Sequence, residues 1–267
     1  MTKLSSIAYY RALISHLKIE LWRATMNMRL TIVSLTIGLS LIFSSEGFAA
    51  KEKFVFVNIK ANANVSLEKE WWTGNDKPST YALLPLGKVD KFDGPDDQKV
   101  EFKIEKKAMA LYGNNAQQLP KKIEGIKIDP QAQKIKYIYF FHATGWEENA
   151  KPSYTFTMNY TDDKKEVLEI QSGINSDDWC HIEAKLKDEN SVWGWIKNEG
   201  HPCGKAGVIT TRWENPRKDT AITSIDVESL ITNAAPIIPA ITLGDVVMSV
   251  DPKQKLAAQW AQLKQIK

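Results

Sequence analysis

The stretch from residue 53 to residue 243 is a succession of short segments with the character of β-strands. Residues 100–105 alternate strictly between apolar and polar side chains, the pattern of a strand with one buried face. Residues 134–141 alternate at first and then become continuously apolar, which indicates a central strand buried on both faces. No long helical period lies between these segments. The chain is therefore predicted to be all-β, as a sandwich or barrel.

Further segments continue the same pattern. Residues 154–160 and 166–170 predict a hairpin, because residues 161–165 between them tolerate turn conformations. The other expected strands are residues 53–59, 192–196, 207–213, 222–227 and 236–243. Neither an internal repeat nor a low-complexity linker divides this region, so one domain is expected over residues 50–250.

The first 49 residues have the character of a leader. Residues 30–43 form an uncharged run of 14 residues after Arg29. A membrane-spanning helix needs about 20 apolar residues, so the run fits a signal peptide better, with cleavage after Ala49. An uncleaved anchor is the alternative. Residues 1–25 are too long for a usual charged segment and suggest an upstream extension, with the true start at Met26 or Met28, or else an amphipathic helix.

The leader also carries the charge imbalance. It holds five of the 35 basic and two of the 32 acidic residues, which leaves 30 of each from residue 50 onward. A balanced body offers no clustered cations for nucleic acid. We expect an exported protein, periplasmic or extracellular, with no nucleic-acid partner and no membrane span once the leader is removed.

Two cysteines occur, Cys180 and Cys203, and export favours a disulfide between them. The closed loop would contain 24 residues. Constraining a loop of that size stabilises a fold by roughly 3 kcal/mol in the chain-entropy model. Two alternatives remain open: unpaired thiols, or a zinc site completed by His181 and His201.

The last segment differs from the body. Asp251 and Pro252 are typical of the start of a helix, and apolar side chains recur along one face at Leu256, Trp260 and Leu263. Residues 251–267 therefore predict a short amphipathic helix. It either docks against the sandwich or binds a protein partner or a membrane surface.

Signatures of catalysis are missing from the sequence: there is no nucleophile elbow, phosphate-binding loop or zinc-protease motif. His142 follows an apolar strand and is expected to be a core histidine bonded to backbone. Residues 93–97 could supply oxygen ligands to a structural calcium ion, although a simple turn is the plainer interpretation. We expect no enzyme activity, no catalytic residue, no metal site and, apart from that calcium, no cofactor.

Tryptophan is in excess. Eight of the nine tryptophans follow residue 50, and most are expected in the core. Trp71 and Trp72 stand among polar residues, which predicts a loop that could stack on sugar rings. Trp193 and Trp195 are two residues apart and are expected to share one strand face. These four residues are the candidate carbohydrate-binding residues.

Five segments together resemble a known family. They are residues 136–143, ending Phe-His-Ala; residues 154–160, followed by Asp162-Asp163; Gly173-Ile174-Asn175 with Asp178-Trp179; Trp213-Glu214-Asn215-Pro216-Arg217, followed by residues 222–226; and residues 239–242. Their order resembles the galactose-binding-like jelly-roll modules of exported bacterial proteins, which occur alone or beside glycoside hydrolases. The resemblance covers residues 54–243 and implies a jelly-roll β-sandwich with a non-catalytic role. Asp162-Asp163 departs from the Asp-Gly expected there, and residues 180–203 have no counterpart.

The leading hypothesis is therefore an exported, non-catalytic β-sandwich that binds carbohydrate through aromatic loops. One alternative is a structural or assembly module of the cell envelope that makes protein contacts, in part through residues 251–267. The other is a hydrolase acting on glycans, which would need two carboxylates facing a sugar across a cleft.

Overall fold

A computed structural model describes residues 54–73, 75–129, 132–148, 151–180, 182, 186–198 and 204–248. The chain divides into two units, Met1–Lys51 and Glu52–Lys267, and every described residue belongs to the second. The leader with Ala49, the C-terminal segment 251–267, and Cys203 lie outside the described residues. Among the described residues no helix is both long enough and apolar enough to cross a membrane.

Antiparallel strands dominate the described part of the chain, which confirms the all-β prediction. They are β1 (Val55–Phe56), β2 (Val65–Ser66), β3 (Lys88–Asp93), β4 (Lys99–Ile104), β5 (Lys107–Ala110), β6 (Lys122–Lys127), β7 (Ala132–Gly145), β8 (Pro152–Tyr160), β9 (Lys165–Gln171), β10 (Ser191–Lys197), β11 (Ala206–Glu214), β12 (Ile222–Ser229) and β13 (Ala235–Met248). Two short 3₁₀ turns, η2 (Thr80–Leu83) and η3 (Pro95–Asp97), accompany them.

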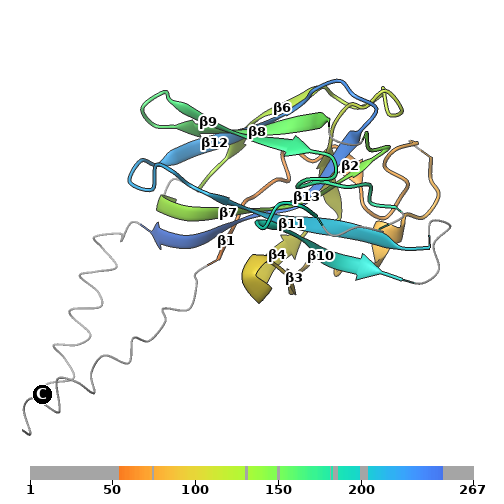
Figure 1. Ribbon diagram of the computed structural model, residues 1–267, viewed down its shortest axis with the longest axis horizontal. Helices are drawn as coiled ribbons and strands as arrows, with labels where there is room; N and C mark the ends of the chain where they lie inside the picture. The colour runs from red at the N-terminus through yellow and green to blue at the C-terminus, as the bar shows by residue number, and fades with distance from the viewer. Residues whose placement is uncertain are drawn as a thin grey trace, which may run out of the picture. The chain divides into compact units, whose positions relative to one another are not determined.

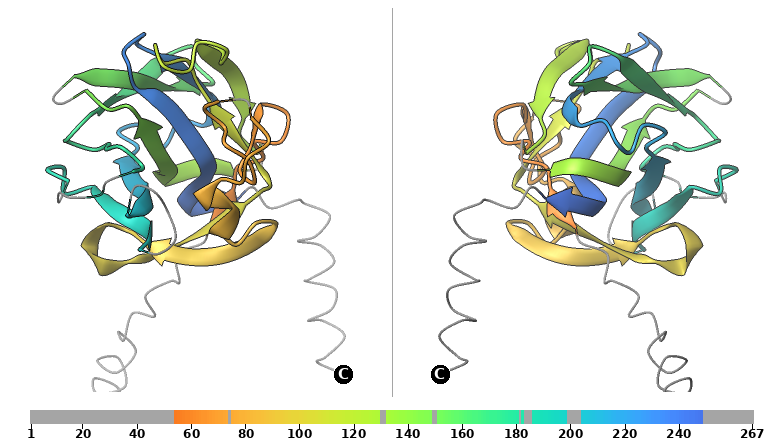
Figure 2. Two further views of the ribbon diagram at one scale, coloured as in Figure 1. Left: turned by 90° about the vertical axis from the view of Figure 1, so that its right-hand side faces the viewer. Right: turned by 90° about the vertical axis from the view of Figure 1, so that its left-hand side faces the viewer.

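The strands form three layers. A seven-stranded sheet has the order β10-β11-β7-β13-β5-β2, with β1 also beside β13. A four-stranded sheet, β6-β12-β8-β9, lies over one of its faces, and the β3–β4 hairpin lies on the other side (Figure 1). Figure 2 shows the hairpin crossing beneath the larger sheet. Two antiparallel sheets packed face to face have the architecture of a β-sandwich.

Strand β7 is the centre of the larger sheet and is buried on both faces, as its sequence predicts. Its side chains alternate between two cores. Phe140 enters the core shared with the four-stranded sheet, where its ring stacks on Phe156 with centroids 3.9 Å apart. Phe141 enters the core under the hairpin and stacks on Phe102 at 4.8 Å. Both sides of one strand therefore contribute to the burial of apolar surface that stabilises the fold.

A polar chain crosses the first core at His142. The Tyr154 hydroxyl lies 2.5 Å from Nδ1 of His142, and Thr211 Oγ1 lies 2.8 Å from Nε2. Thr211 continues to Ser191 at 2.8 Å, and the Ser191 hydroxyl donates to Asp188 at 2.7 Å. His142 is a core residue, as predicted, but the expectation of backbone partners is wrong: hydroxyl groups satisfy both ring nitrogens.

Residues that carry the family resemblance hold turns in place. Asn215 is fully buried; it accepts from the Tyr160 hydroxyl at 2.6 Å and donates to Ile135 O at 2.8 Å. Asn175 accepts from Gln171 N at 2.7 Å in the same manner. Asp163 has a φ of +62°, the left-handed conformation that the expected glycine would have taken. These positions are therefore structural.

Burial keeps His142 neutral and lowers its pKa to about 3. In the unfolded chain the histidine titrates near its ordinary pKa of about 6.5. Below that pH the unfolded chain therefore binds a proton that the folded chain does not bind. This part of the stability is present above pH 6.5 and is lost as the pH falls toward 3. We expect the free energy of unfolding to fall by up to about 1.4 kcal/mol per pH unit from this group.

His142→Gln should remove that component. Denaturant unfolding of both proteins at several pH values between these two pKa values measures the difference, in which the carboxylates common to both proteins cancel. Identical pH profiles for the wild type and the variant would contradict the prediction.

Candidate functional site: an aromatic and acidic loop rim

Loops from four parts of the chain meet where β7 ends and β13 begins. Gly145 at the end of β7 pairs with Ala235 at the start of β13. Trp179 N donates to Thr144 O at 2.8 Å, and Leu230 N donates to Ser153 O at 3.0 Å. We call this end of the sandwich the loop rim and define it as residues 71–73, 146–148, 177–179 and 230–233.

Aromatic side chains run from the loop rim into the core beneath it. Trp72 lies 5.5 Å from Trp71 and 4.7 Å from Trp179, measured between ring centroids. Tyr81 joins Trp179 at 5.6 Å to Trp195 at 6.2 Å. The structure thus brings three of the four predicted tryptophans, Trp71, Trp72 and Trp195, into one cluster. Trp71 is buried, whereas Trp72 and Trp195 are half-buried, so packing is the main role of this cluster.

Trp193 lies on the other face of its strand, so the expectation that Trp193 and Trp195 share a face is wrong. A β-bulge falls between them: Trp193 pairs with Ile209 and Trp195 with Val208. Paired residues share a face and consecutive residues do not. The extra residue of the bulge therefore turns the two tryptophans to opposite sides.

Trp146 is the exposed tryptophan of the loop rim, and it was not among the predicted binding residues. Its side chain is 37% exposed and its φ is +56°, a conformation that is unusual for a bulky residue. Its N–H donates to Asp178 Oδ2 at 2.8 Å, which ties the end of β7 to the segment after β9. A tryptophan directly after a buried strand was the available signal, but the strained turn that exposes it follows from tertiary contacts.

Three carboxyl groups gather beside Trp146. Burial raises the pKa of Asp178, while the backbone N–H groups of Cys180, Trp146 and Glu147 hydrogen-bond to it. Glu147 Oε2 accepts from Asp178 N at 2.9 Å, and Asp177 Oδ1 accepts from the same N–H at 2.8 Å. Burial and a hydrogen bond to Asp177 raise the pKa of Glu147 to about 8. Glu147 therefore keeps its proton at neutral pH.

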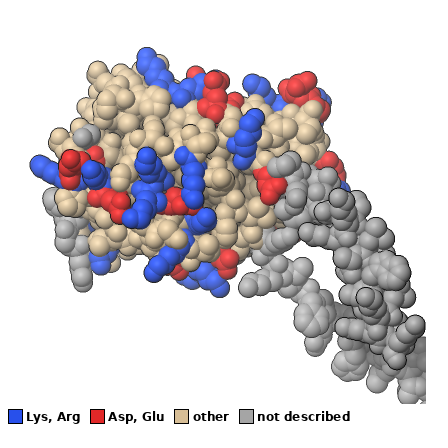
Figure 3. All heavy atoms as spheres, turned by 180° about the vertical axis from the view of Figure 1, so that it is seen from behind, with Lys and Arg blue, Asp and Glu red and all other residues tan. Residues whose placement is uncertain are grey.

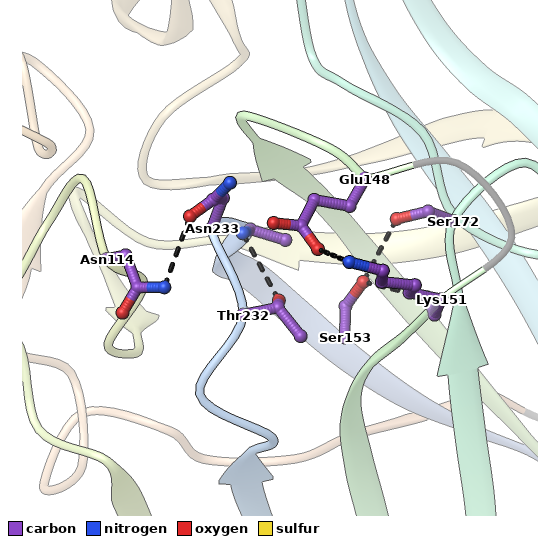
Figure 4. A network of polar contacts seen from close by, with 8 residues as sticks. Asn114, Glu148, Lys151, Ser153, Ser172, Thr232 and Asn233 are labelled. Atoms are coloured by element: carbon purple, nitrogen blue, oxygen red, sulfur yellow. Dashed lines mark hydrogen bonds and ion pairs between the residues drawn. The ribbon is translucent and has the colours of Figure 1, made fainter.

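A second polar network of the loop rim is centred on Glu148 (Figure 4). Glu148 lies between Asn233 and Lys151, whose ammonium donates to it at 2.7 Å and lowers the pKa of Glu148. Asn114 donates to Asn233 Oδ1 at 3.1 Å. Beside this network, Leu230 and Ile231 are 41% and 51% exposed. The loop rim therefore combines exposed apolar side chains with positioned polar groups.

The segment considered for calcium forms a turn around η3. Asp96 of that turn accepts from Arg212 Nη1 at 2.6 Å. No group of three or more His, Cys, Asp or Glu residues in the described part of the chain is placed to hold a metal ion. A pocket of about 320 Å³ lies there, lined by η3 and by residues around Asp188, and none of its described lining residues is aromatic. It is therefore not a place where a sugar ring could stack.

The comparisons with known proteins add no family. No protein-family model matches the chain, and no curated protein matches it in sequence.

Cys180 ends the segment that supports Trp146. A backbone bridge joins Cys180 to Ala206, three residues after Cys203. Cys203 itself, like His181 and His201 of the zinc alternative, lies outside the described residues, so the disulfide stays a prediction. Three residues span at most about 11 Å, which keeps the bond within reach of the chain.

We expect a non-reducing peptide map of the purified protein to contain a cross-linked Cys180–Cys203 peptide that disappears on reduction. Reduction should also lower the free energy of unfolding by roughly 3 kcal/mol. Two free thiols in an unreduced thiol titration, or zinc retained after dialysis, would contradict the disulfide.

Proposed function

We propose that the protein is an exported, non-catalytic β-sandwich that binds carbohydrate through the loop rim, with Trp146 as the stacking surface. The observation that carries the proposal is the exposed Trp146 ring on a turn that hydrogen bonds to Asp178 hold in place. A bulky side chain in a left-handed conformation at a loop is a strained arrangement, and such strain concentrates at functional sites.

The chemistry around Trp146 suits a sugar. An aromatic face packs against the apolar C–H face of a sugar ring, and hydroxyl groups need hydrogen-bond acceptors and donors at the ring's edge. The carboxyl groups of Glu147, Glu148 and Asp177 belong to the loop rim with Trp146 and offer such groups. An apolar platform with a few positioned polar groups is the usual composition of a small-molecule site.

Charge favours a neutral ligand. From residue 50 onward the chain has 30 basic and 30 acidic residues. On the face drawn in Figure 3, Lys and Arg lie among Asp and Glu. Ion pairs such as that of Lys122 with Glu124, at 2.9 Å, join opposite charges on the surface. The loop rim itself is acidic. A strongly anionic polysaccharide or a nucleic acid would need a basic groove, so an uncharged glycan fits the site better.

Relationship to the galactose-binding-like jelly-roll modules is the finer part of the proposal. The packed antiparallel sheets support a sandwich of this general kind. The resembling residues His142, Asn175 and Asn215 lie in the core and in turns. They would account for a shared scaffold and carry no information about the ligand.

Each alternative function has one observation in its favour. Exposed Leu230 and Ile231 give the loop rim an apolar border that a protein partner could cover, as an envelope assembly module would require. The raised pKa of Glu147 is a property of catalytic acids. A glycosidase, however, places a sugar between carboxyl groups that are about 5–10 Å apart. Glu147 and Asp177 hydrogen-bond to each other, which leaves no room for that sugar.

Trp146→Ala should lower the affinity for neutral polysaccharides about tenfold or more, because an exposed aromatic platform is a binding hot spot. Affinity electrophoresis against a panel of neutral and acidic polysaccharides, or a glycan array, measures the effect. Circular dichroism confirms that the variant remains folded.

Val167→Ala is the matched control, since Val167 is 58% exposed and belongs to strand β9 rather than to the loop rim. It should leave binding unchanged. If the folded wild-type protein is retarded by no polysaccharide, or if Trp146→Ala binds as tightly as the wild type, the proposal fails.

A further inference from the structure

Two carboxyl groups from different segments meet at the loop rim. Glu147 lies just after β7, and Asp177 lies after β9. Both accept from the N–H of Asp178, at 2.9 Å and 2.8 Å, and they hydrogen-bond to each other. Two carboxylates in contact cannot both be charged without strong repulsion, so this contact requires a proton between them.

The charged groups around the pair do not replace that proton. On the segment of Glu147, Glu148 is engaged by Lys151. On the opposite segment, Asp178 is acidic and accepts hydrogen bonds from backbone N–H groups. The charge of Asp178 also helps to raise the pKa of the buried Tyr81 hydroxyl. Among the described residues, the charges acting on Glu147 are those of Asp177 and Asp178, and both disfavour its ionisation.

The pair is mechanically linked to Trp146. Asp178 accepts from Trp146 N at 2.8 Å, while its own N–H is the donor that both carboxyl groups share. Thr144 adds two bonds between the same segments, because its N and its hydroxyl both donate to Asp177 O, at 3.2 Å and 3.0 Å. A force that separates Glu147 from Asp177 therefore acts directly on the strained turn at Trp146.

We propose that Glu147 and Asp177 form a pH-sensitive clasp, which holds Trp146 in its binding position while Glu147 is protonated and releases Trp146 when Glu147 ionises. On release the proton passes to water, and the two carboxylates repel each other. Glu147 and Asp177 are positioning residues in this device. Its effect on ligands rests on the carbohydrate binding proposed above, whereas its effect on Trp146 does not.

The pKa of Glu147, raised to about 8, places the change in mildly alkaline conditions. The direction follows from the shift. A carboxyl group whose pKa is raised in the folded protein is stabilised in its protonated form, so the clasp is closed below this pKa and opens as the pH rises through it.

The test follows Trp146 itself by ¹⁹F NMR of the full chain labelled with 5-fluorotryptophan. Trp146→Phe identifies the Trp146 resonance by its loss. We expect this resonance to move between about pH 6 and pH 10. The midpoint should lie near the pKa of Glu147, which is raised to about 8. Glu147→Gln should abolish the movement, because an amide keeps a hydrogen bond to Asp177 and cannot ionise.

Glu148→Gln is the matched control: it removes the same charge one residue away and should titrate like the wild type. If Glu147→Gln fails to fold, Asp177→Asn tests the same contact from the other side. A Trp146 resonance that stays fixed over the pH range in the wild type overturns the clasp. So does a resonance that moves as far in Glu147→Gln and Asp177→Asn as it does in the wild type.

Polysaccharide affinity measured over the same pH range separates the two proposals. We expect a loss of about threefold or more above the midpoint in the wild type, and none in Glu147→Gln, as for a site whose competent state becomes less populated. A resonance that titrates in a protein that binds no polysaccharide supports the clasp and rejects the proposed function. Polysaccharide binding that is independent of pH, in a protein whose Trp146 resonance stays fixed, supports the proposed function and rejects the clasp.

Discussion

The residues of β7 from Ile138 to Gly145 are all buried, so both faces of this strand must be covered by other parts of the chain. The four-stranded sheet covers one face, around Phe140, and the β3–β4 hairpin with the preceding loops covers the other, around Phe141. Neighbouring β11 and β13 satisfy the backbone of β7 on its two edges. Because close-packed interiors resist displacement, the end of β7 is a fixed point from which the loop rim is built.

Buried polar groups have different kinds of hydrogen-bond partner inside the sandwich and at the loop rim. In the core, His142 has a hydroxyl partner at each ring nitrogen, and the chain continues through Thr211 to Ser191 and Asp188. A satisfied network of this kind stabilises one arrangement of the sheets. At the rim, Glu147 and Asp177 are partners of each other and depend on a proton. The core network is therefore insensitive to pH near neutrality, and the rim contact is sensitive to it.

Much of the fold could be predicted from periodicity. The alternating pattern of residues 100–105 became β4, and the apolar run of residues 134–141 became the middle of β7. Four strands were not predicted from the sequence, namely β2, β3, β5 and β6, and two of them gave weak signals. β3 has only one buried side chain, Phe92, so it lacks an alternating pattern, and β5 is a four-residue segment with two alanines. Such strands form because a neighbour supplies the ladder and the core, which a local pattern does not record.

The candidate site was less predictable than the fold. Most tryptophans were expected in the core, and Trp71 is buried there, but the exposed tryptophan of the loop rim is Trp146, and a bulge separates Trp193 from Trp195. A bulge adds one residue to one strand, so the side chains beyond it switch to the opposite face. In the sequence Val-Trp-Gly-Trp-Ile, the glycine is the one local signal of such a bulge.

The sequence alone determined the all-β class, the positions of most strands along the chain, the double burial of β7, and the balanced charge from residue 50 onward, because these depend on local periodicity and composition. Only the tertiary structure decided which side chains meet at the loop rim. Glu147 and Asp177 are 30 positions apart, and their contact exists because β7 and the segment after β9 end at the same edge of the sandwich. Proximity between distant residues, and the proton that this contact requires, follow from packing rather than from any local pattern.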